Sequence, residues 1–381
     1  MHGTRGRKVM ATDSNQTRSA NQGSRRMSAK QKAARKRRKI IVFAVEIIIL
    51  LAMAGILFAL YDKTEEGPAV VELPSEEEEI GIAPEIVESQ VMKGYWNIAL
   101  FGVDAESEKY LMKGSRSDSI MIASINLDTG EIKLVSVYRD TFLNIGDDYY
   151  IKCNAAYSNG GGEQAVTMLN ANLDLDIQDF IAIGYEGLKG VVDGLGGVYL
   201  DVDEQEIKHI NNYQYTINQL LDCGYEEVTE TGYQLLDGMQ AAAYCRIRYR
   251  TGDDFARAAS QRELIQAIED RIKEVDLNTL TKVFEEAMKH VVTSLTTDDI
   301  LPYLTQVADY EIVDEGGFPE ASMRGTGNIG SKGSSVIPLN LESNVAWLHE
   351  FLFDVEDYQV SEKVKEYSKQ IEAQTAPYLN R

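Results

Sequence analysis

The strongest constraint in this sequence is an apolar run of 22 residues, 40–61, in which Glu46 is the single charged side chain. As a helix rising about 1.5 Å per residue it would extend about 33 Å, which matches a hydrocarbon core of about 30 Å. A buried core helix or a cleaved signal peptide fits less well, because the run is uninterrupted and its small-x-small site at residues 52–54 lies inside it. The sequence therefore predicts one transmembrane helix at residues 40–61.

The net charge of the chain changes sign at this apolar run. Residues 1–39 contain 13 basic and 1 acidic side chains, a net charge of +12, and the whole chain has a net charge of −22, so the remainder carries −34. The positive-inside rule places the N-terminus in the cytoplasm and the remainder outside the cell membrane. An acidic body argues against a nucleic-acid partner, which requires a basic face.

Composition divides the chain into five segments. Residues 1–39 are predicted to be a disordered basic cytoplasmic tail that precedes the transmembrane helix. Residues 62–94 contain three prolines and a run of four glutamates, and indicate an acidic extracytoplasmic spacer. A globular domain is predicted at residues 95–355, followed by a C-terminal tail at residues 356–381.

Strand-like and helix-like patterns alternate through the globular domain. Two β-rich runs at residues 119–127 and 132–137 flank Asp128-Thr129-Gly130 and predict a hairpin. The other predicted strands are at residues 97–103, 180–185, 198–202, 310–313 and 335–337. The predicted helices are at residues 163–173, 188–193, 233–244, 254–273, 278–306 and 345–352. This alternation predicts an α/β (α+β) fold with a mixed sheet covered by helices.

Four charged residues fall near the ends of predicted strands. If the hairpin turns around Thr129, Asp118 and Arg139 lie at the same end of the sheet, where Asp104 and Arg116 also come close. Carboxylates hold Mg²⁺ and arginines hold phosphate oxygens, so this set suits a metal-bound phosphate. Surface ion pairs at strand ends explain the same spacing equally well.

A second charged group lies at residues 244–250, with the sequence YCRIRYR. If extended, this segment places its three arginines on one face, where their mutual repulsion requires an anion. Asp254, Arg257 and Gln261 follow at i, i+3 and i+7, which is one face of a helix. A solvated charged face is the alternative, but together with the arginines an anion site is favoured.

The remaining residues of chemical interest give weaker signals. Cys153, Cys223 and Cys245 are too few for a disulfide framework, and their number and spacing disfavour a Cys223–Cys245 bridge. The four histidines show no metal-ligand spacing. Lys152, taken alone, is more typical of a surface lysine than of a phosphate ligand.

In their order along the chain, these segments resemble the motifs of the LytR-CpsA-Psr family. The matching segments are residues 97–104 (NIALFGVD), 116–119 (RSDS), 136–141 (SVYRDT), 152–155 (KCNA), 192–198 (VDGLGGV), 236–241 (LDGMQA), 244–248 (YCRIR) and 254–257 (DFAR) with Gln261. The resemblance covers residues 96–273 and includes the N-terminal anchor. One departure is Ser260, where the family has arginine and Arg262 follows instead, which puts one accessory phosphate contact in doubt.

The resemblance implies an α/β/α domain with a largely antiparallel central sheet, an apolar pocket for a polyprenyl tail and a diphosphate site at its mouth. It implies that Asp104 and Asp118 bind Mg²⁺ or Mn²⁺. The implied diphosphate ligands are Arg116, Arg139, Arg246, Arg248 and Arg257, with Lys152 and Gln261 assisting. Asp254 would orient these arginines or act as a general base, and Asp140 is the other candidate for the base.

The implied activity is that of a phosphotransferase that moves a glycopolymer, such as teichoic acid or capsule, from a polyprenyl-diphosphate carrier to peptidoglycan. Catalysis would rest on charge stabilisation and positioning. Two alternatives stay open: a polyprenyl-diphosphate hydrolase, and a non-enzymatic lipid-binding regulator of the envelope. The implied location is the cytoplasmic membrane, crossed once, with the catalytic domain extracellular.

Overall fold

The computed structural model describes residues 68–77, 79–105, 108–248, 254–296 and 310–379. The predicted cytoplasmic tail, the predicted transmembrane helix and the first part of the predicted spacer lie outside the described residues. Within the described ranges, no helix combines the length and the apolar composition that a membrane crossing needs.

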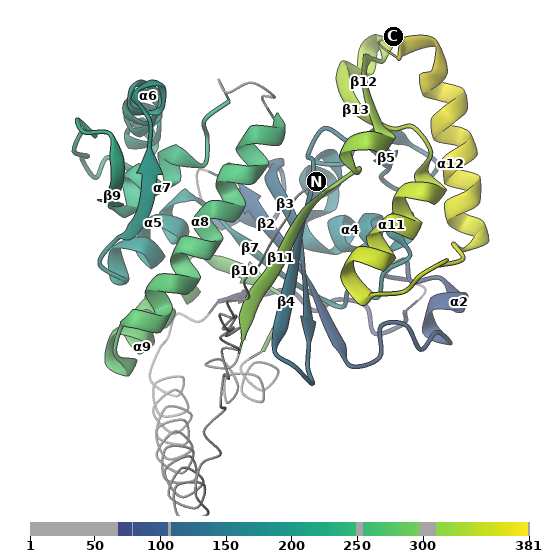
Figure 1. Cartoon of the computed structure of the whole chain (residues 1–381), viewed down its shortest axis with the longest axis horizontal. Coiled ribbons are helices and arrows are strands. Elements are labelled where there is room, and N and C mark those ends of the chain that lie inside the picture. The colour runs from purple at the N-terminus through teal and green to yellow at the C-terminus, as the bar shows by residue number, and fades with distance from the viewer. Residues whose placement is uncertain (1–67, 78, 106–107, 249–253, 297–309, 380–381) are drawn as a thin grey trace, which may run out of the picture. The chain divides into compact units, whose positions relative to one another are not determined.

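A seven-stranded sheet runs through the described residues in the order β1-β10-β7-β2-β3-β4-β11 (Figure 1). Its strands are β1 Ala69–Val70, β2 Tyr95–Val103, β3 Ser117–Asn126, β4 Glu131–Val137, β7 Asp179–Ile183, β10 Val291–Thr293 and β11 Glu311–Phe318. Three of its described pairings are parallel and three are antiparallel. The sheet is mixed, as predicted, but it is not largely antiparallel, because long crossover connections bring β7 beside β2 and β11 beside β4 in the parallel direction.

The predicted hairpin at the centre of this sheet is confirmed. β3 and β4 pair antiparallel with Met121 opposite Ser136, and the amide of Gly130 donates to the carbonyl of Asn126. Gly130 has a φ of 78°, a left-handed conformation that glycine adopts without steric cost. The turn fixes the register, so the residues that follow β4 arrive beside the first residues of β3.

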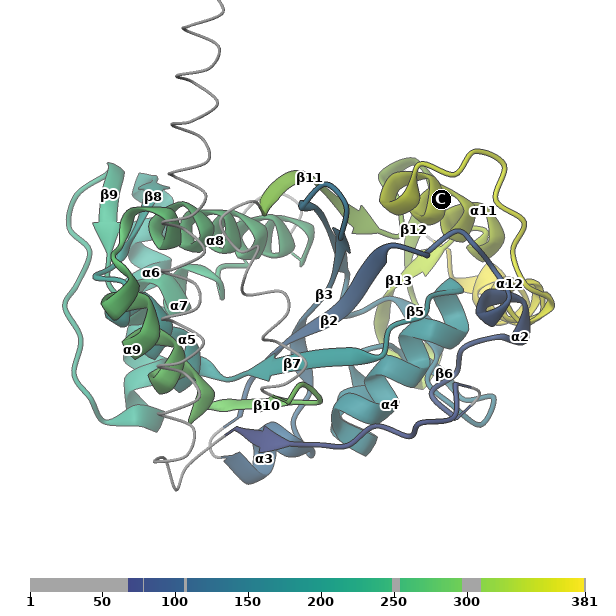
Figure 2. The ribbon, with the colours of Figure 1, turned by 90° about the horizontal axis from the view of Figure 1, so that it is seen from below.

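Two groups of elements cover the sheet from opposite sides (Figure 2). The first group contains α5 Tyr185–Gly194, α6 Glu204–Leu221, α7 Gly238–Tyr244, α8 Asp254–Glu274, α9 Leu277–Met288 and the hairpin of β8 Val198–Val202 with β9 Gly232–Leu236. The second group contains α2 Pro84–Val87, α4 Ala155–Leu173, α11 Leu341–Phe353, α12 Glu362–Thr375, and the hairpins β5 Phe142–Asn144 with β6 Tyr150–Lys152 and β12 Arg324–Asn328 with β13 Ser334–Pro338. A short helix, α3 Glu108–Met112, lies near β10 and α4.

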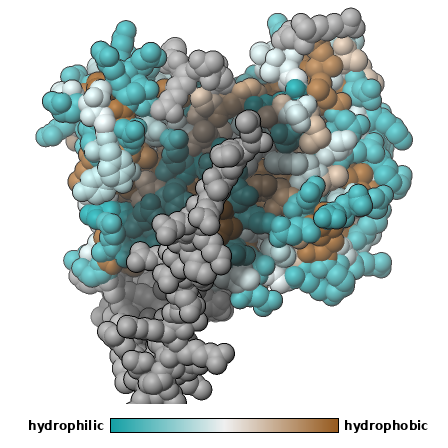
Figure 3. Space-filling model, in the orientation of Figure 1, coloured by the Kyte–Doolittle hydropathy of each residue, from teal (hydrophilic) through white to brown (hydrophobic). Residues whose placement is uncertain are grey.

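Buried apolar side chains of the described residues form two large cores. The larger core lies between the sheet and the second group, and Phe101 and Leu169 belong to it. The smaller one lies inside the first group, among its helices and the β8–β9 hairpin, and includes Ile210. Hydrophilic side chains cover most of the described surface in the view of Figure 3. Since the first group packs largely on itself, it leaves room between its helices and the sheet.

Two predicted helices are wrong in part. Residues 233–244 begin as strand β9, which pairs with β8, and only then form the short helix α7. The break lies at Asp237, whose side chain accepts from the amide of Gln240 while the Gln240 side chain accepts from the amide of Asp237. Of the helices predicted within residues 278–306, α9 accounts for the first part and ends at Met288, but strand β10 follows where a helix was expected. Residues 297–309 lie outside the described part of the chain.

The predicted acidic spacer is wrong for most of residues 69–94. β1 belongs to the sheet, and Ile80, Ile82 and Met92 are buried in the larger core with 2–4% of their surface exposed. The side-chain amide of Asn170 also donates to the backbone carbonyl of Ile80. Glutamates and prolines gave this stretch the pattern of a solvated spacer, but burial of the isoleucines between them is favourable, so the segment folds onto the domain.

The domain also continues past the boundary predicted at residue 355. α12 places Val364 and Ile371 in the larger core. Just before α12, the backbone amide and the hydroxyl of Ser361 donate to the buried carboxylate of Asp174. The described residues after 355 are therefore part of the fold and not a tail.

Replacing Ile82 by alanine should lower the free energy of unfolding by about 2–4 kcal/mol, because the change leaves a cavity in the larger core. Val87 at the end of α2 is 46% exposed, so Val87→Ala should change the free energy by less than about 0.5 kcal/mol. Urea denaturation followed by circular dichroism measures both effects. Equally small effects would mean that this segment is a solvated spacer after all.

Candidate active site

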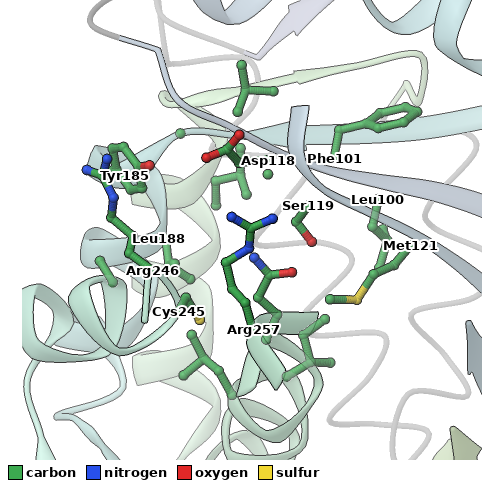
Figure 4. Close-up of a pocket in the computed structure, with 18 of the residues that line it drawn as sticks. Leu100, Phe101, Asp118, Ser119, Met121, Tyr185, Leu188, Cys245, Arg246 and Arg257 are labelled. Carbon is green, nitrogen blue, oxygen red and sulfur yellow. The ribbon is translucent and has the colours of Figure 1, made fainter. Parts of the chain in front are cut away.

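A cavity of about 380 Å³ separates the sheet from helices α5 to α8 (Figure 4). Most of its lining is apolar. The apolar side chains come from β2, β3, β7, α5 and α8, and include Leu100, Met121, Ile181, Ile183, Leu188 and Leu264. Concave apolar sites of this size with a few polar groups are typical of small-molecule or lipid binding.

Charged and polar side chains gather in one part of the same cavity. They are Asp118 from β3, Arg246 and Arg248 from the segment after α7, and Arg257 with Gln261 from α8. Figure 4 shows the guanidinium group of Arg257 directed toward Asp118. The fold thus brings together the two charged groups that the sequence analysis identified separately.

Arg139 lies among three carboxylates at this site. Its Nη1 donates to Oδ1 of Asp118, and its Nε lies 3.7 Å from a carboxylate oxygen of Asp140 and 3.7 Å from one of Asp254. Burial alone lowers the pKa of Arg139, but the three carboxylates outweigh burial and raise that pKa. The β3–β4 hairpin delivers Arg139 to Asp118, as its spacing around the turn predicted.

Arg257 is more deeply buried than Arg139, Arg246 and Arg248, with 4% of its side chain exposed. Its Nη2 lies 2.8 Å from Oδ1 of Asp254, one turn earlier in α8. Burial lowers the pKa of Arg257, and Asp254 opposes this effect by its negative charge. An arginine nevertheless stays protonated in proteins, so Arg257 holds a buried positive charge.

Several buried guanidinium nitrogens of the site have no hydrogen-bond acceptor among the described residues. They are Nε and Nη1 of Arg257, Nη1 of Arg246 and Nε of Arg139. A buried donor without an acceptor costs about 1–3 kcal/mol, and more when the group is charged. Donors of this kind beside a cavity suit an anion, because its oxygens would satisfy them in the fork geometry of arginine.

Arg246 and Arg248 reach the cavity from a turn. The extended conformation considered for this segment is not the one observed, because residues 245–246 form a turn that follows α7. Nη2 of Arg246 lies 3.5 Å from Asp104, and Nη2 of Arg248 lies 3.5 Å from Asp118. Each arginine therefore approaches one of the two predicted metal ligands.

Two tyrosines that the sequence analysis missed lie against Arg246. The guanidinium carbon of Arg246 lies 4.8 Å from the ring centroid of Tyr185 in α5 and 5.4 Å from that of Tyr213 in α6. Figure 4 shows the ring of Tyr185 beside this guanidinium group. Burial raises the pKa of Tyr185, so its hydroxyl stays protonated at neutral pH. The one sequence signal that could have pointed to Tyr185 is its position two residues after the end of strand β7.

Other predicted residues lie at the margin of the site. Nζ of Lys152 donates to Oδ2 of Asp140 at 3.0 Å, so Lys152 joins the same network of charges. Arg116 is exposed, directly before β3, and is not among the residues that line the cavity. Arg250 lies outside the described residues.

The departure from the family motif at Ser260 has a structural counterpart. Ser260 is buried in α8, and Arg262 turns away from the cavity. Arg262 donates to the hydroxyl of Ser136 and lies 3.3 Å from Glu315 in β11. Arg262 therefore does not take the place of the arginine that Ser260 replaces.

Within the described residues, no group of three or more histidine, cysteine and carboxylate side chains is placed to hold a metal ion. Asp104 and Asp118 both raise the pKa of Tyr185 through their charge, although less than burial does, so both carboxylates lie near the same ring. Two carboxylates leave most of the coordination sphere of a cation to ligand oxygens and water, an arrangement that Mg²⁺ commonly adopts with phosphates.

The cysteines take no part in a disulfide. Cys153, Cys223 and Cys245 are all free. Cys245 lines the cavity, and burial raises the pKa of its thiol to about 12. This thiol is therefore neutral and unreactive, and it contributes to the lining as a small apolar side chain.

The sequence also matches known proteins. The LytR_cpsA_psr family model matches residues 71–335. The polyisoprenyl-teichoic acid–peptidoglycan teichoic acid transferase TagU of Enterococcus faecalis is 27% identical over 297 residues, which cover 75% of this chain and 87% of TagU. TagV of Bacillus subtilis, which is also named a polyisoprenyl-teichoic acid–peptidoglycan teichoic acid transferase, is 25% identical over 266 residues. These residues cover 68% of this chain and 64% of TagV.

A solved structure of TagT with bound octaprenyl pyrophosphate lipid has the same fold. The two structures align with a TM-score of 0.52 at 20% identity, over 75% of this chain and 100% of TagT. The family model spans the β2–β3–β4 strands, the cavity and the arginines beside it. The earlier resemblance is thereby confirmed: this chain belongs to the LytR_cpsA_psr family.

Proposed function

We propose that this protein transfers a glycopolymer from a polyprenyl-diphosphate carrier to peptidoglycan. The observation that supports the proposal is the set of buried guanidinium donors without acceptors beside an apolar cavity. A ligand that suits both parts has a hydrocarbon tail and a compact, multiply charged head. A polyprenyl diphosphate has this form, and the names of TagU and TagV describe the transfer of teichoic acid from a polyisoprenyl carrier to peptidoglycan.

The tail of the carrier would lie in the cavity and its diphosphate against the arginines. Arg139, Arg246, Arg248 and Arg257 offer planar forks that match phosphate oxygens, and Gln261 adds an amide. These groups contact only what all such carriers share, which is the lipid diphosphate. The glycopolymer itself, teichoic acid or capsule, would extend away from the cavity.

The carboxylates present fit a hard divalent cation. Asp104 and Asp118 would hold Mg²⁺, with the diphosphate oxygens and water as the other ligands. Mn²⁺ accepts the same oxygen ligands. When bound, the cation would neutralise negative charge on the diphosphate during the reaction. The arginine partners of both carboxylates would then be released toward the substrate.

The transfer itself is a displacement at phosphorus. A sugar hydroxyl of peptidoglycan attacks the phosphorus nearer the glycopolymer, and a new oxygen–phosphorus bond forms. The bond from that phosphorus to the bridging oxygen breaks, and polyprenyl phosphate leaves with the electron pair. The arginines of the site keep their positions while negative charge develops on the bridging oxygen. Such preorganised stabilisation is the main contribution a protein makes to phosphoryl transfer.

The proton of the attacking hydroxyl needs an acceptor, for which Asp140 and Asp254 are the candidates. The two carboxylates approach Nε of Arg139 at the same distance of 3.7 Å. Asp140 also holds Lys152, and Asp254 holds Arg257. Each candidate carboxylate therefore has a second role, which is to hold a basic side chain that would bind the diphosphate.

The reaction requires the site to face the outer side of the cytoplasmic membrane. The predicted span at residues 40–61 and the basic residues before it would place the globular domain there. The anchor would keep the enzyme beside the lipid that it consumes.

Arg257→Gln should lower the rate of transfer at least 100-fold, because it removes a buried cation whose donors would bind the diphosphate. Arg271→Gln is the matched control, since Arg271 lies in the same helix but pairs with Glu274 and the carbonyl of Leu195. The assay follows labelled glycopolymer from its lipid carrier to purified peptidoglycan. Thermal unfolding confirms that both variants fold.

The same assay tests the alternatives. A hydrolase would cleave the lipid diphosphate equally fast with and without peptidoglycan. A lipid-binding regulator would leave the labelled polymer on its carrier in the wild-type protein. Either result would overturn the proposal.

Asp118→Asn should reduce transfer at least 100-fold and should raise the Mg²⁺ concentration needed for half-maximal rate, since a neutral amide binds the cation more weakly than a carboxylate. Removal of divalent cations by a chelator should abolish wild-type transfer, and added Mg²⁺ or Mn²⁺ should restore it. Wild-type transfer that is insensitive to the chelator would contradict the metal role. A variant with a lower rate but an unchanged Mg²⁺ dependence would mean that Asp118 serves only to hold Arg139 and Arg248.

A further inference from the structure

We propose that Tyr185 and Tyr213 are positioning residues that hold the guanidinium group of Arg246 against two neutral rings, so that its edge is free for a phosphate oxygen. We call this pair the tyrosine clamp. The inference rests on the proposed function and adds to it, because neither tyrosine belongs to the motifs that the sequence analysis identified.

Three elements build the clamp. Tyr185 begins α5, Tyr213 lies in α6, and Arg246 lies in the turn after α7, where its amide donates to the carbonyl of Ala243. The guanidinium carbon of Arg246 lies 4.8 Å and 5.4 Å from the two ring centroids. Both distances are within the range of about 6 Å in which a ring attracts a cation.

The rings and the hydrogen-bond acceptors use different parts of the guanidinium group of Arg246. Its central carbon lies over the two aromatic rings, whereas its N–H donors lie in the plane of the group. Nη2 lies 3.5 Å from Asp104, and Nη1 is buried without an acceptor among the described residues. The rings therefore restrain Arg246 without using the donors that a diphosphate requires.

Neutral rings suit this position better than further carboxylates would. A carboxylate would hold Arg246 firmly, but its negative charge would also repel the diphosphate. Asp104, which forms an ion pair with Arg246, is also the proposed cation ligand. When Asp104 turns to a cation, the tyrosine clamp would still keep Arg246 in place.

The test measures binding of a defined probe, farnesyl diphosphate, to the full-length protein by calorimetry with Mg²⁺ present. Tyr185→Leu keeps an apolar side chain beside the cavity but removes the ring, and it should weaken binding about ten-fold, which corresponds to about 1.4 kcal/mol. Tyr185→Phe keeps the ring and should bind within two-fold of the wild-type protein. Binding of farnesol, which has no diphosphate, should be equal in the wild-type protein and in Tyr185→Leu.

A double-mutant cycle separates positioning from lost tail contact. If Tyr185 acts through Arg246, then Tyr185→Leu should change binding less than two-fold once Arg246→Ala is present. Tyr233→Leu is the aromatic control, since Tyr233 stacks on Tyr199 and is 75% exposed away from the cavity lining. Thermal unfolding of each variant checks the fold.

Each outcome decides the proposal. Additive losses in the cycle, or a Tyr185→Phe variant as weak as Tyr185→Leu, would overturn the tyrosine clamp and leave the proposed function standing. A wild-type protein that does not bind farnesyl diphosphate would overturn the lipid-diphosphate site and the clamp together. A loss confined to the variants without a ring at position 185, and absent without Arg246, would establish it.

Discussion

The site depends on placing one buried arginine and three partly buried ones close together without neutralising their positive charge. Arg257, with 4% of its side chain exposed, requires a carboxylate nearby, because an isolated buried cation is very costly. Each carboxylate forms ion pairs with two arginines: Asp118 with Arg139 and Arg248, and Asp254 with Arg139 and Arg257. These shared ion pairs offset part of the cost of burying the arginines, but they leave some guanidinium N–H donors of the described residues without an acceptor. A fully paired cluster would have little affinity for an anion.

The cavity beside the arginines follows from how the apolar side chains are divided. The larger core fills one side of the sheet, whereas α5 to α8 form a core of their own with the β8–β9 hairpin. Strand residues such as Leu100 and Met121 therefore face an open space. An unfilled apolar cavity costs stability, and a ligand that fills it stabilises the folded state. The head and the tail of an amphiphilic ligand would thus be bound by adjacent parts of one site.

The charge of the remainder of the chain gives the arginines further importance. Residues 40–381 carry a net charge of −34, which opposes the approach of a polyanion. Attraction to a diphosphate must come from basic side chains gathered in one place. The β3–β4 hairpin, the turn after α7 and α8 supply these side chains together. Rings such as those of Tyr185 and Tyr213 support such cations without adding negative charge.

Features that depend on neighbours in the chain could be predicted from the amino-acid sequence. The turn at Asp128–Gly130 and the alternation on both sides of it specify a hairpin, which is why the meeting of Asp118 with Arg139 could be predicted. The spacing of Asp254, Arg257 and Gln261 fixes one face of a helix in the same way. Which faces meet across the cavity depends instead on the three-dimensional packing. The same packing places Tyr185 and Tyr213 against Arg246 and buries Ile80 and Ile82. The reason is that local spacing sets positions within an element, whereas burial depends on the packing of elements that are distant in sequence.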